Sequence, residues 1–178
     1  MDTIRVNDKE FRLFLSESQI KVAIKKIAKQ INKDLDGKNP IFLAILNGSF
    51  MFASDLMKHI TIPSEISFVK LASYEGMQSE GKVKEVFGLS ERIDGRTVVI
   101  VEDIVDSGRT MQQLLFSLSS RNPAEIRIAT FLSKPAALQC ELNLNYVAFE
   151  IPNDFVVGFG LDYNGYGRNY GELYSLIH

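Results

Sequence analysis

The residues best suited to carry chemistry lie together between Val101 and Thr110, in the run V-E-D-I-V-D-S-G-R-T. Adjacent carboxylates such as those of Glu102 and Asp103 can accept hydrogen bonds from paired sugar hydroxyls or help to hold a hydrated Mg²⁺ ion. Backbone N–H groups at the start of a helix, next to hydroxyls and a glycine that lets the main chain come close, form a cradle for phosphate. The run therefore indicates a site for a phosphorylated sugar. Its candidate residues are Glu102, Asp103, Asp106, Ser107, Gly108, Arg109 and Thr110.

The elements around this run explain why it should be exposed to a ligand. Thr97 to Val101 is the most β-branched run of the chain and passes directly into the acids, which predicts a strand. A helix should follow from Thr110 to Arg121, because Asn122 and Pro123 then stop it. In an open parallel sheet, ligands bind beyond the carboxyl ends of the strands. The acidic run has this position.

The rest of the chain alternates predicted helices and strands. Ser16 and Gln19 resemble a capping box, and isoleucines recur behind them at helical spacing. The predicted helices are Ser16 to Leu35 and roughly Phe50 to His59, and the predicted strands are Ile41 to Leu46, Ile66 to Ala72 and Ile126 to Leu132. This alternation predicts an α/β fold with a mostly parallel, twisted sheet flanked by helices. The tail from Tyr146 onward is rich in strand-forming and aromatic residues, which indicates a smaller antiparallel flap.

Length and composition limit the class of protein. A chain of 178 residues suits one domain with a sizeable core, and 46% hydrophobic with 24% charged residues is typical of a globular protein. The net charge of −2 gives no sign of the strongly basic surface that nucleic-acid binding usually needs. We therefore expect small-molecule substrates and no nucleic acid.

The cysteine and histidine content excludes other chemistries. Cys140 is the only cysteine, so no internal disulfide forms and a reducing compartment is expected. With His59 and His178 as the only histidines, a Cys/His zinc site is nearly excluded. There is no signal-peptide pattern and no long uncharged apolar stretch, so we expect a cytoplasmic protein that does not enter the membrane.

Two familiar motifs fail on inspection. Gly158-Phe159-Gly160 starts like a dinucleotide-binding fingerprint, but Tyr163 stands at the position of the last glycine. Asp106-Ser107-Gly108 is similar to the nucleophile region of some serine hydrolases, but no histidine lies near it in the sequence.

The acidic run resembles the phosphoribosyl pyrophosphate motif of type I phosphoribosyltransferases. Roughly from Ile41 to Arg168, the chain is similar to the hypoxanthine-guanine members of that family. The resemblance implies the type I fold in a single domain, residues 1–178, with a core at about 16–140. A small hood would come from the N- and C-terminal segments, at about 1–15 and 141–178.

The resemblance also implies roles for residues outside the acidic run. Leu46-Asn47-Gly48-Ser49 resembles the pyrophosphate loop of the family, with a cis peptide between Leu46 and Asn47. Many relatives carry a basic residue where this chain has Asn47. The implied pyrophosphate contacts are Leu46, Asn47, Gly48 and Arg168, the purine contacts are Lys134, Phe155, Val156 and Asp162, and the metal ligands are Glu102, Asp103 and Asp162. Ser73 and Tyr74 resemble the start of the mobile catalytic loop that closes over the site.

The activity implied by the resemblance is purine salvage. The enzyme would use Mg²⁺ to transfer a phosphoribosyl group from phosphoribosyl pyrophosphate to hypoxanthine or guanine, giving IMP or GMP. Asp106 would accept the purine proton, Lys134 would donate to the 6-oxo group, the ring of Phe155 would stack on the base and the backbone of Val156 would bind its edge. The family suggests a homodimer or homotetramer.

Several alternatives remain open at this point. The chain could be a regulator that senses phosphoribosyl pyrophosphate, or an enzyme for another base such as xanthine. Residue by residue, Leu46 to Ser49 could be an ordinary turn, Lys134 a solvated side chain, Phe155 a core residue and Arg168 a surface arginine.

Overall fold

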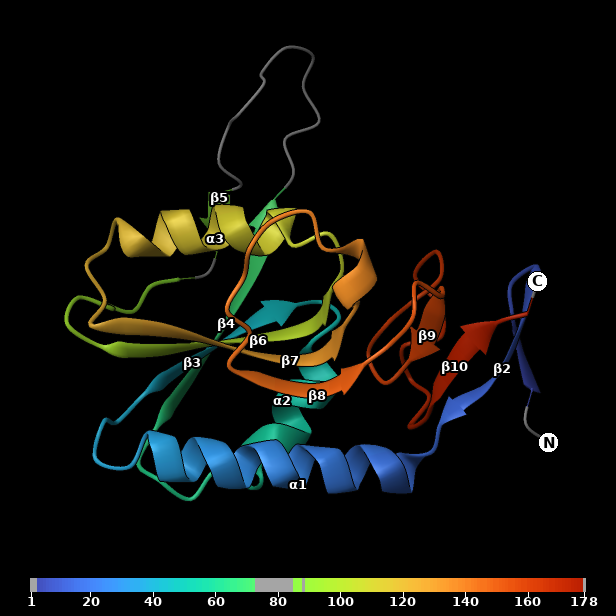
Figure 1. The fold of residues 1–178 in the computed structure, drawn as a ribbon, viewed down its shortest axis with the longest axis horizontal. Helices are drawn as coiled ribbons and strands as arrows, with labels where there is room; N and C mark the ends of the chain where they lie inside the picture. The colour runs from blue at the N-terminus through green and yellow to red at the C-terminus, as the bar shows by residue number, and fades with distance from the viewer. Residues whose placement is uncertain (1–2, 73–84, 88, 178) are drawn as a thin grey trace, which may run out of the picture.

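The larger of two sheets forms the body of the protein. The computed structural model describes residues 3–72, 85–87 and 89–177, so Ser73 and Tyr74 lie outside the described residues. In this part of the chain, six strands are arranged in the order β5-β4-β3-β6-β7-β8 (Figure 1). Their bounds are β3 (Ile41–Leu46), β4 (Glu65–Ala72), β5 (Glu85–Phe87), β6 (Thr97–Val105), β7 (Glu125–Ser133) and β8 (Tyr146–Glu150).

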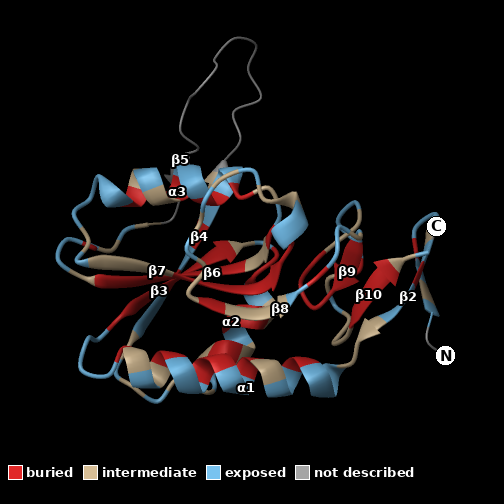
Figure 2. Cartoon of the chain, in the orientation of Figure 1, coloured by how far each residue is buried: buried red, intermediate tan, exposed pale blue. Residues whose placement is uncertain are grey.

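Strands β4, β3, β6, β7 and β8 are parallel to one another, and β5 is antiparallel to β4. The apolar runs of β3 and β6 are buried along most of their length, as Figure 2 shows for the centre of the sheet. Continuous apolar runs are expected for parallel strands, because both faces of such a sheet are covered. The predicted α/β fold is confirmed.

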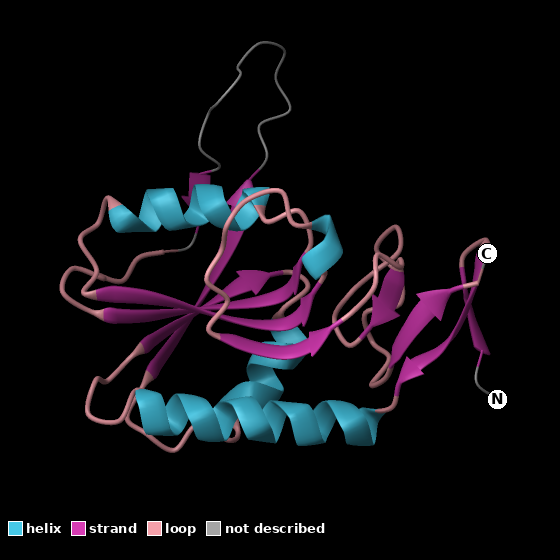
Figure 3. Cartoon of the chain, in the orientation of Figure 1, coloured by secondary structure: helices cyan, strands magenta, loops and turns pink. Residues whose placement is uncertain are grey.

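Helices cover both faces of this sheet (Figure 3). Helices α1 (Glu17–Asp34) and α2 (Phe50–Met57) pack on one face, and α3 (Arg109–Ser119) packs on the other. The predicted capping box of α1 is present, with Ser16 and Gln19 bonded to each other's backbone N–H groups. Helix α2 ends two residues before the predicted His59. No described helix combines the length and apolar character needed to cross a membrane.

The two ends of the described chain form a smaller antiparallel sheet in the order β1-β2-β10-β9, which we call the hood. Its strands are β1 (Thr3–Val6), β2 (Lys9–Leu15), β9 (Val156–Gly158) and β10 (Leu173–Leu176). The predicted hood from both terminal segments is therefore present. The prediction that the antiparallel flap begins at Tyr146 is wrong, because β8 pairs in parallel with β7 and belongs to the larger sheet. The division of the single domain near residue 140 stays a prediction.

The order of the strands places a crevice between β3 and β6. These strands are neighbours, but the chain continues from β3 to β4 on one side and from β6 to β7 on the other. Such a switch point opens a crevice at the carboxyl ends of the two strands, where ligands bind in open α/β sheets. The loop after Leu46 and the acidic run both lie at this edge.

Candidate active site

The acidic run begins inside strand β6. The strand continues to Val105, four residues beyond the predicted Val101, so Glu102 and Asp103 belong to its carboxyl-terminal end rather than to the loop after it. Neighbouring side chains of a strand leave the backbone toward opposite faces, so the two carboxylates approach the site from different directions. The backbone N–H of Asp103 donates to Glu102 Oε1 at 3.3 Å, and that of Ile104 donates to Asp103 Oδ1 at 2.8 Å.

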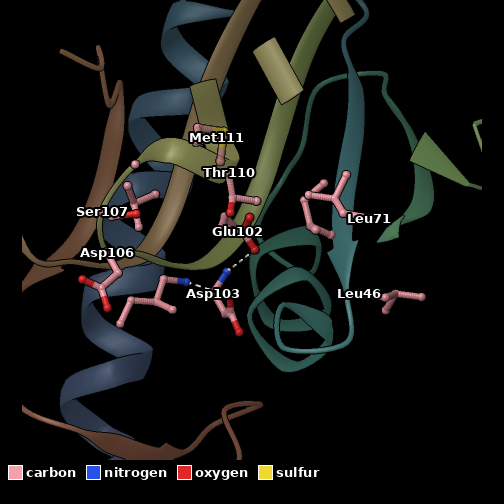
Figure 4. A pocket seen from close by; sticks show the side chains of 12 residues that line it. Leu46, Leu71, Glu102, Asp103, Asp106, Ser107, Thr110 and Met111 are labelled. Carbon is pink, nitrogen blue, oxygen red and sulfur yellow. Dashed lines mark hydrogen bonds between the residues drawn. The ribbon is translucent and has the colours of Figure 1, made fainter. Parts of the chain in front are cut away.

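A cavity of about 280 Å³ opens where β6 passes into α3, which we call the sugar cavity. Figure 4 shows Glu102 and Asp103 close together on β6, with Asp106, Ser107 and Thr110 following toward α3. The cavity is lined by Ile45, Leu46, Leu71, Glu102, Asp103, Ile104, Val105, Asp106, Ser107, Gly108, Thr110 and Met111. Gly108 precedes the helix with a φ of 79°, a conformation that glycine adopts without strain.

The carboxyl group of Asp103 is perturbed by its surroundings. Burial raises the pKa of its carboxyl, because a charged group is disfavoured where water is excluded. A hydrogen bond with Glu102, the N–H of Ile104 and the positive charge of Arg168 act in the opposite direction. A cation bound beside Asp103 would therefore stabilise the charged form of this carboxyl.

A second cavity of about 230 Å³ lies between the end of β6 and the hood, and we call it the base cavity. It is lined by Asp103, Ile104, Asp106, Lys134, Phe155, Val156, Leu161 and Asp162. The side chain of Lys134 is only 9% exposed, and its Nζ lies 3.4 Å from Asp106 Oδ2. Asp103, Ile104 and Asp106 line both cavities, so the two spaces meet at the end of β6.

The hood supplies an apolar wall for the base cavity. Phe155 is 44% exposed, and its ring lies 6.3 Å from that of Phe11 and 5.8 Å, edge to face, from that of Tyr163. Val156, the next residue, is buried at the start of β9. A partly exposed aromatic ring held by other rings suits stacking on a flat ligand.

The loop after β3 approaches the acids from the other side of the crevice. Its Leu46–Asn47 peptide is cis, as the resemblance implies. Asn47 is exposed, and Gly48 is buried so closely against Asp103 that a Cβ there would collide with Oδ2. Ser49 is fully buried, and its hydroxyl has no hydrogen-bond partner in the described part of the chain.

Asp162 and Arg168 form an ion pair beside this loop. Arg168 Nη2 lies 2.6 Å from Asp162 Oδ1, and Arg168 Nη1 donates to the carbonyl of Gly160 at 2.7 Å. Asp162 Oδ2 also accepts the N–H of Gly165 at 2.6 Å. Both side chains are thus held in one orientation by neighbours within the same short stretch of chain.

The structure brings most of the predicted residues to one edge of the sheet, but not all of them line the cavities. Arg109 is exposed on α3 and lines neither cavity, and Asn47, Gly48 and Arg168 stand beside them. Sequence reasoning missed the apolar lining residues of the two cavities, which are Ile45, Leu71, Ile104, Val105, Met111 and Leu161. Ile104 could have been found, because it stands between the acids of the run.

The predicted metal ligands supply hard oxygen donors. Among the described residues, no group of three or more acidic, cysteine or histidine side chains is arranged to enclose a metal ion. Mg²⁺ is usually held by one or two carboxylates with water and substrate phosphates rather than by a protein cage. The arrangement of Glu102 and Asp103 fits this mode.

Comparison with known proteins agrees with the geometry. The family model described as phosphoribosyl transferase domain matches residues 14–164. A hypoxanthine-guanine phosphoribosyltransferase of Streptococcus pyogenes serotype M3 is 41% identical over 163 residues, which cover 91% of this chain and 89% of that protein.

Solved structures give the same result. The crystal structure of a hypoxanthine phosphoribosyltransferase from Staphylococcus aureus is similar with a TM-score of 0.86 and 36% identity, over 93% of this chain and 91% of that one. The hypoxanthine phosphoribosyl transferase of Trypanosoma cruzi, studied for the role of its C-terminal region in oligomeric state and activity, has a TM-score of 0.87 and 29% identity. That match covers 98% of this chain and 95% of the other.

Proposed function

The chain belongs to the phosphoribosyl transferase family, and on this basis we propose that it is a purine-salvage enzyme acting on hypoxanthine or guanine. It transfers the 5-phosphoribosyl group of phosphoribosyl pyrophosphate to the base and releases pyrophosphate. The products are IMP and GMP.

One observation carries this proposal: the sugar cavity and the base cavity meet at Asp103, Ile104 and Asp106. A transferase of this kind must hold the anomeric carbon of the sugar next to a nitrogen of the base. Two adjoining spaces of different chemistry, one ending in a phosphate cradle and one walled by an aromatic ring, meet that requirement. Holding both reactants in place removes much of the entropic barrier.

The sugar phosphate is held by the turn before α3. The backbone N–H groups from Ser107 to Thr110 and the hydroxyls of Ser107 and Thr110 bind the 5-phosphate, because the N-terminus of a helix attracts anions. The carboxylates of Glu102 and Asp103 accept hydrogen bonds from the ribose hydroxyls.

The leaving pyrophosphate is bound between the loop after β3 and Arg168. Backbone N–H groups near Gly48 and the guanidinium of Arg168 donate to its oxygens as negative charge develops. Donors that are fixed before the reaction stabilise this charge without reorganising, which is usually the largest catalytic contribution. The guanidinium has five N–H donors, so its contacts with Gly160 and Asp162 leave others for the ligand.

Mg²⁺ belongs to this proposal as a cofactor that one or two of the carboxylates of Glu102, Asp103 and Asp162 would hold, with water and the substrate phosphates completing its coordination. When bound, it supplies positive charge that neutralises the leaving group.

The base is positioned by residues of the base cavity. Lys134 donates from its ammonium group to the 6-oxo group, Phe155 stacks on the ring, and the backbone of Val156 with Asp162 binds the purine edge. Asp106 accepts the proton that the purine nitrogen loses as the new bond forms. Its carboxylate lies between the two cavities and is the group best placed for this role.

Three further features stay predictions. The mobile loop starting at Ser73 and Tyr74 would exclude water from the ribosyl centre during transfer. A homodimer or homotetramer is expected by comparison with the family, and the cytoplasmic location rests on the sequence.

The test is nucleotide formation by the purified chain. The protein is incubated with Mg²⁺, phosphoribosyl pyrophosphate and hypoxanthine, guanine, xanthine or adenine in separate reactions, and the products are separated by chromatography. We expect IMP and GMP. Nucleotide from none of the four bases would refute the proposal, and nucleotide from xanthine alone would change the substrate.

A further inference from the structure

The second glycine of Gly158-Phe159-Gly160 lies where the hood meets the loop after β3. Gly160 is buried with a φ of 99°, and a Cβ there would collide with the carbonyl oxygen of Gly48. The main chain of the hood therefore touches the main chain of the predicted pyrophosphate loop, with no side chain between them.

The same glycine also holds Arg168. The backbone N–H of Gly160 donates to the carbonyl of Arg168 at 3.0 Å, and the carbonyl of Gly160 accepts from Arg168 Nη1 at 2.7 Å. Gly160 is thus bonded to Arg168 through both of its backbone polar groups while its Cα faces Gly48. The loop at Gly48 and the guanidinium of Arg168, which are both proposed to bind pyrophosphate, therefore contact the same residue.

The turn around Gly160 is anchored on its other side. The ring of Phe159 is buried, lies 4.8 Å from the ring of Phe131 on β7, and belongs to the main core. The N–H of Phe159 also donates to the carbonyl of Tyr170 at 2.9 Å. A closely packed core resists displacement, so an added methyl group at Gly160 would move the loop or Arg168 rather than the turn.

We propose that Gly160 is a positioning residue that sets the spacing between the pyrophosphate loop and Arg168. The inference rests on the proposed function, in which both elements bind the leaving pyrophosphate. It assigns no contact with the ligand to Gly160 itself. Its prediction is selective, because two of the proposed purine contacts are held away from Gly160: Lys134 pairs with Asp106, and the ring of Phe155 packs against those of Phe11 and Tyr163.

The test compares Gly160→Ala with Gly37→Ala. Gly37 has a φ of 75°, but a Cβ added to it would meet no atom within 4 Å, so its variant carries the backbone strain without the collision. Binding of inorganic pyrophosphate with Mg²⁺ is measured by calorimetry, and KM is measured for both substrates. We expect Gly160→Ala to weaken pyrophosphate binding and raise KM for phosphoribosyl pyrophosphate by about tenfold or more, with KM for hypoxanthine within about twofold.

Gly37→Ala should leave all of these constants unchanged. If Gly160→Ala binds pyrophosphate as the Gly37→Ala control does, or if both KM values rise together, the inference is overturned. The two proposals can fail separately. If the wild-type protein forms no nucleotide but Gly160→Ala still weakens pyrophosphate binding selectively, the proposed function is refuted and the spacing role of Gly160 is supported.

A second measurement uses the unaltered protein, in case Gly160→Ala fails to fold. Hydrogen exchange is followed with and without Mg²⁺ and pyrophosphate. We expect peptides containing Gly48 and Gly160 to be protected together by pyrophosphate and not by hypoxanthine alone. Protection of only one of the two segments would overturn the inference.

Discussion

Replacing Asp106 by asparagine separates proton transfer from substrate binding. The substitution keeps the shape of the side chain and removes its ability to accept a full proton. Asp106 lies between the sugar and base cavities, so a general base there could act on the purine nitrogen. Loss of a general base lowers turnover by about 10² to 10⁴, which corresponds to about 2.7 to 5.4 kcal/mol in activation free energy.

The structure predicts a much smaller effect of Asp106→Asn on stability. The lost ion pair with Lys134 has an N–O distance of 3.4 Å, and the Asp106 side chain is 54% exposed. Lys134 is only 9% exposed, but the amide oxygen of asparagine can still accept a hydrogen bond from its ammonium group, so we expect a loss of about 1 kcal/mol. The loss of turnover should therefore greatly exceed any loss of folding free energy.

The assay is steady-state IMP formation at saturating phosphoribosyl pyrophosphate, with thermal unfolding of each variant measured in parallel. Asp94→Asn is a matched control, because it removes the same charge at an exposed position away from both cavities. Asp106→Asn should lower kcat strongly and leave KM for phosphoribosyl pyrophosphate within about threefold, since the phosphate cradle is intact. Wild-type turnover in Asp106→Asn, or an equal loss in the control, would refute the reasoning.

Three other predictions test specificity and stability. Wild-type kcat/KM for adenine should be about 10⁴-fold or more below that for hypoxanthine. Lys134→Met should reduce this ratio by lowering kcat/KM for hypoxanthine, because the donor to the 6-oxo group is gone. An equal fall in kcat/KM for both bases would show that Lys134 does not bind the 6-oxo group. Ser49→Ala should melt at the same temperature as wild type or higher, since the buried hydroxyl has no partner in the described residues and burying it costs about 1 to 3 kcal/mol; a clear fall in melting temperature would contradict this. The hydrogen bond from Lys38 lowers the pKa of Glu125 below its ordinary 4.5, so the stabilisation is present above that pH and lost as the pH falls below it. Melting curves of Glu125→Gln across this range should depend less on pH than those of wild type, and parallel curves would argue against the contribution.

Local patterns in the sequence were enough to predict the core elements. Ser16 with Gln19 marks the start of α1, and the apolar runs at Ile41 and Thr97 mark β3 and β6, because capping and burial leave a signature within a few residues. The acidic run was predicted to be a ligand site for the same reason. The acids, the hydroxyls, the preceding strand and the following helix are consecutive in the chain, so one short stretch of sequence shows them all.

Contacts between distant segments were not predictable in this way. The pairing of β8 with β7 rather than with the hood depends on which edge of the sheet is available, and Tyr146 to Glu150 carry no local sign of that choice. The contact between Gly48 and Gly160 joins two loops far apart in sequence. A glycine in the sequence does not show which part of the chain will pack against its Cα. The family resemblance supplied roles for Lys134 and Arg168, and the structure added their neighbours.

The separation of the two sheets has a consequence for how such an enzyme can diversify. Phe155 and Val156 belong to the hood side of the site, where β9 is hydrogen-bonded to β10 and β10 to β2, whereas the acids lie on β6 within the larger sheet. The two sheets share no strand, so substitutions of Phe155 and Val156 would change the wall around the base and alter no backbone hydrogen bond of β6. Enzymes that evolve from one ancestor could in this way change their preference for the base while the sugar-phosphate site on β6 and α3 stays the same.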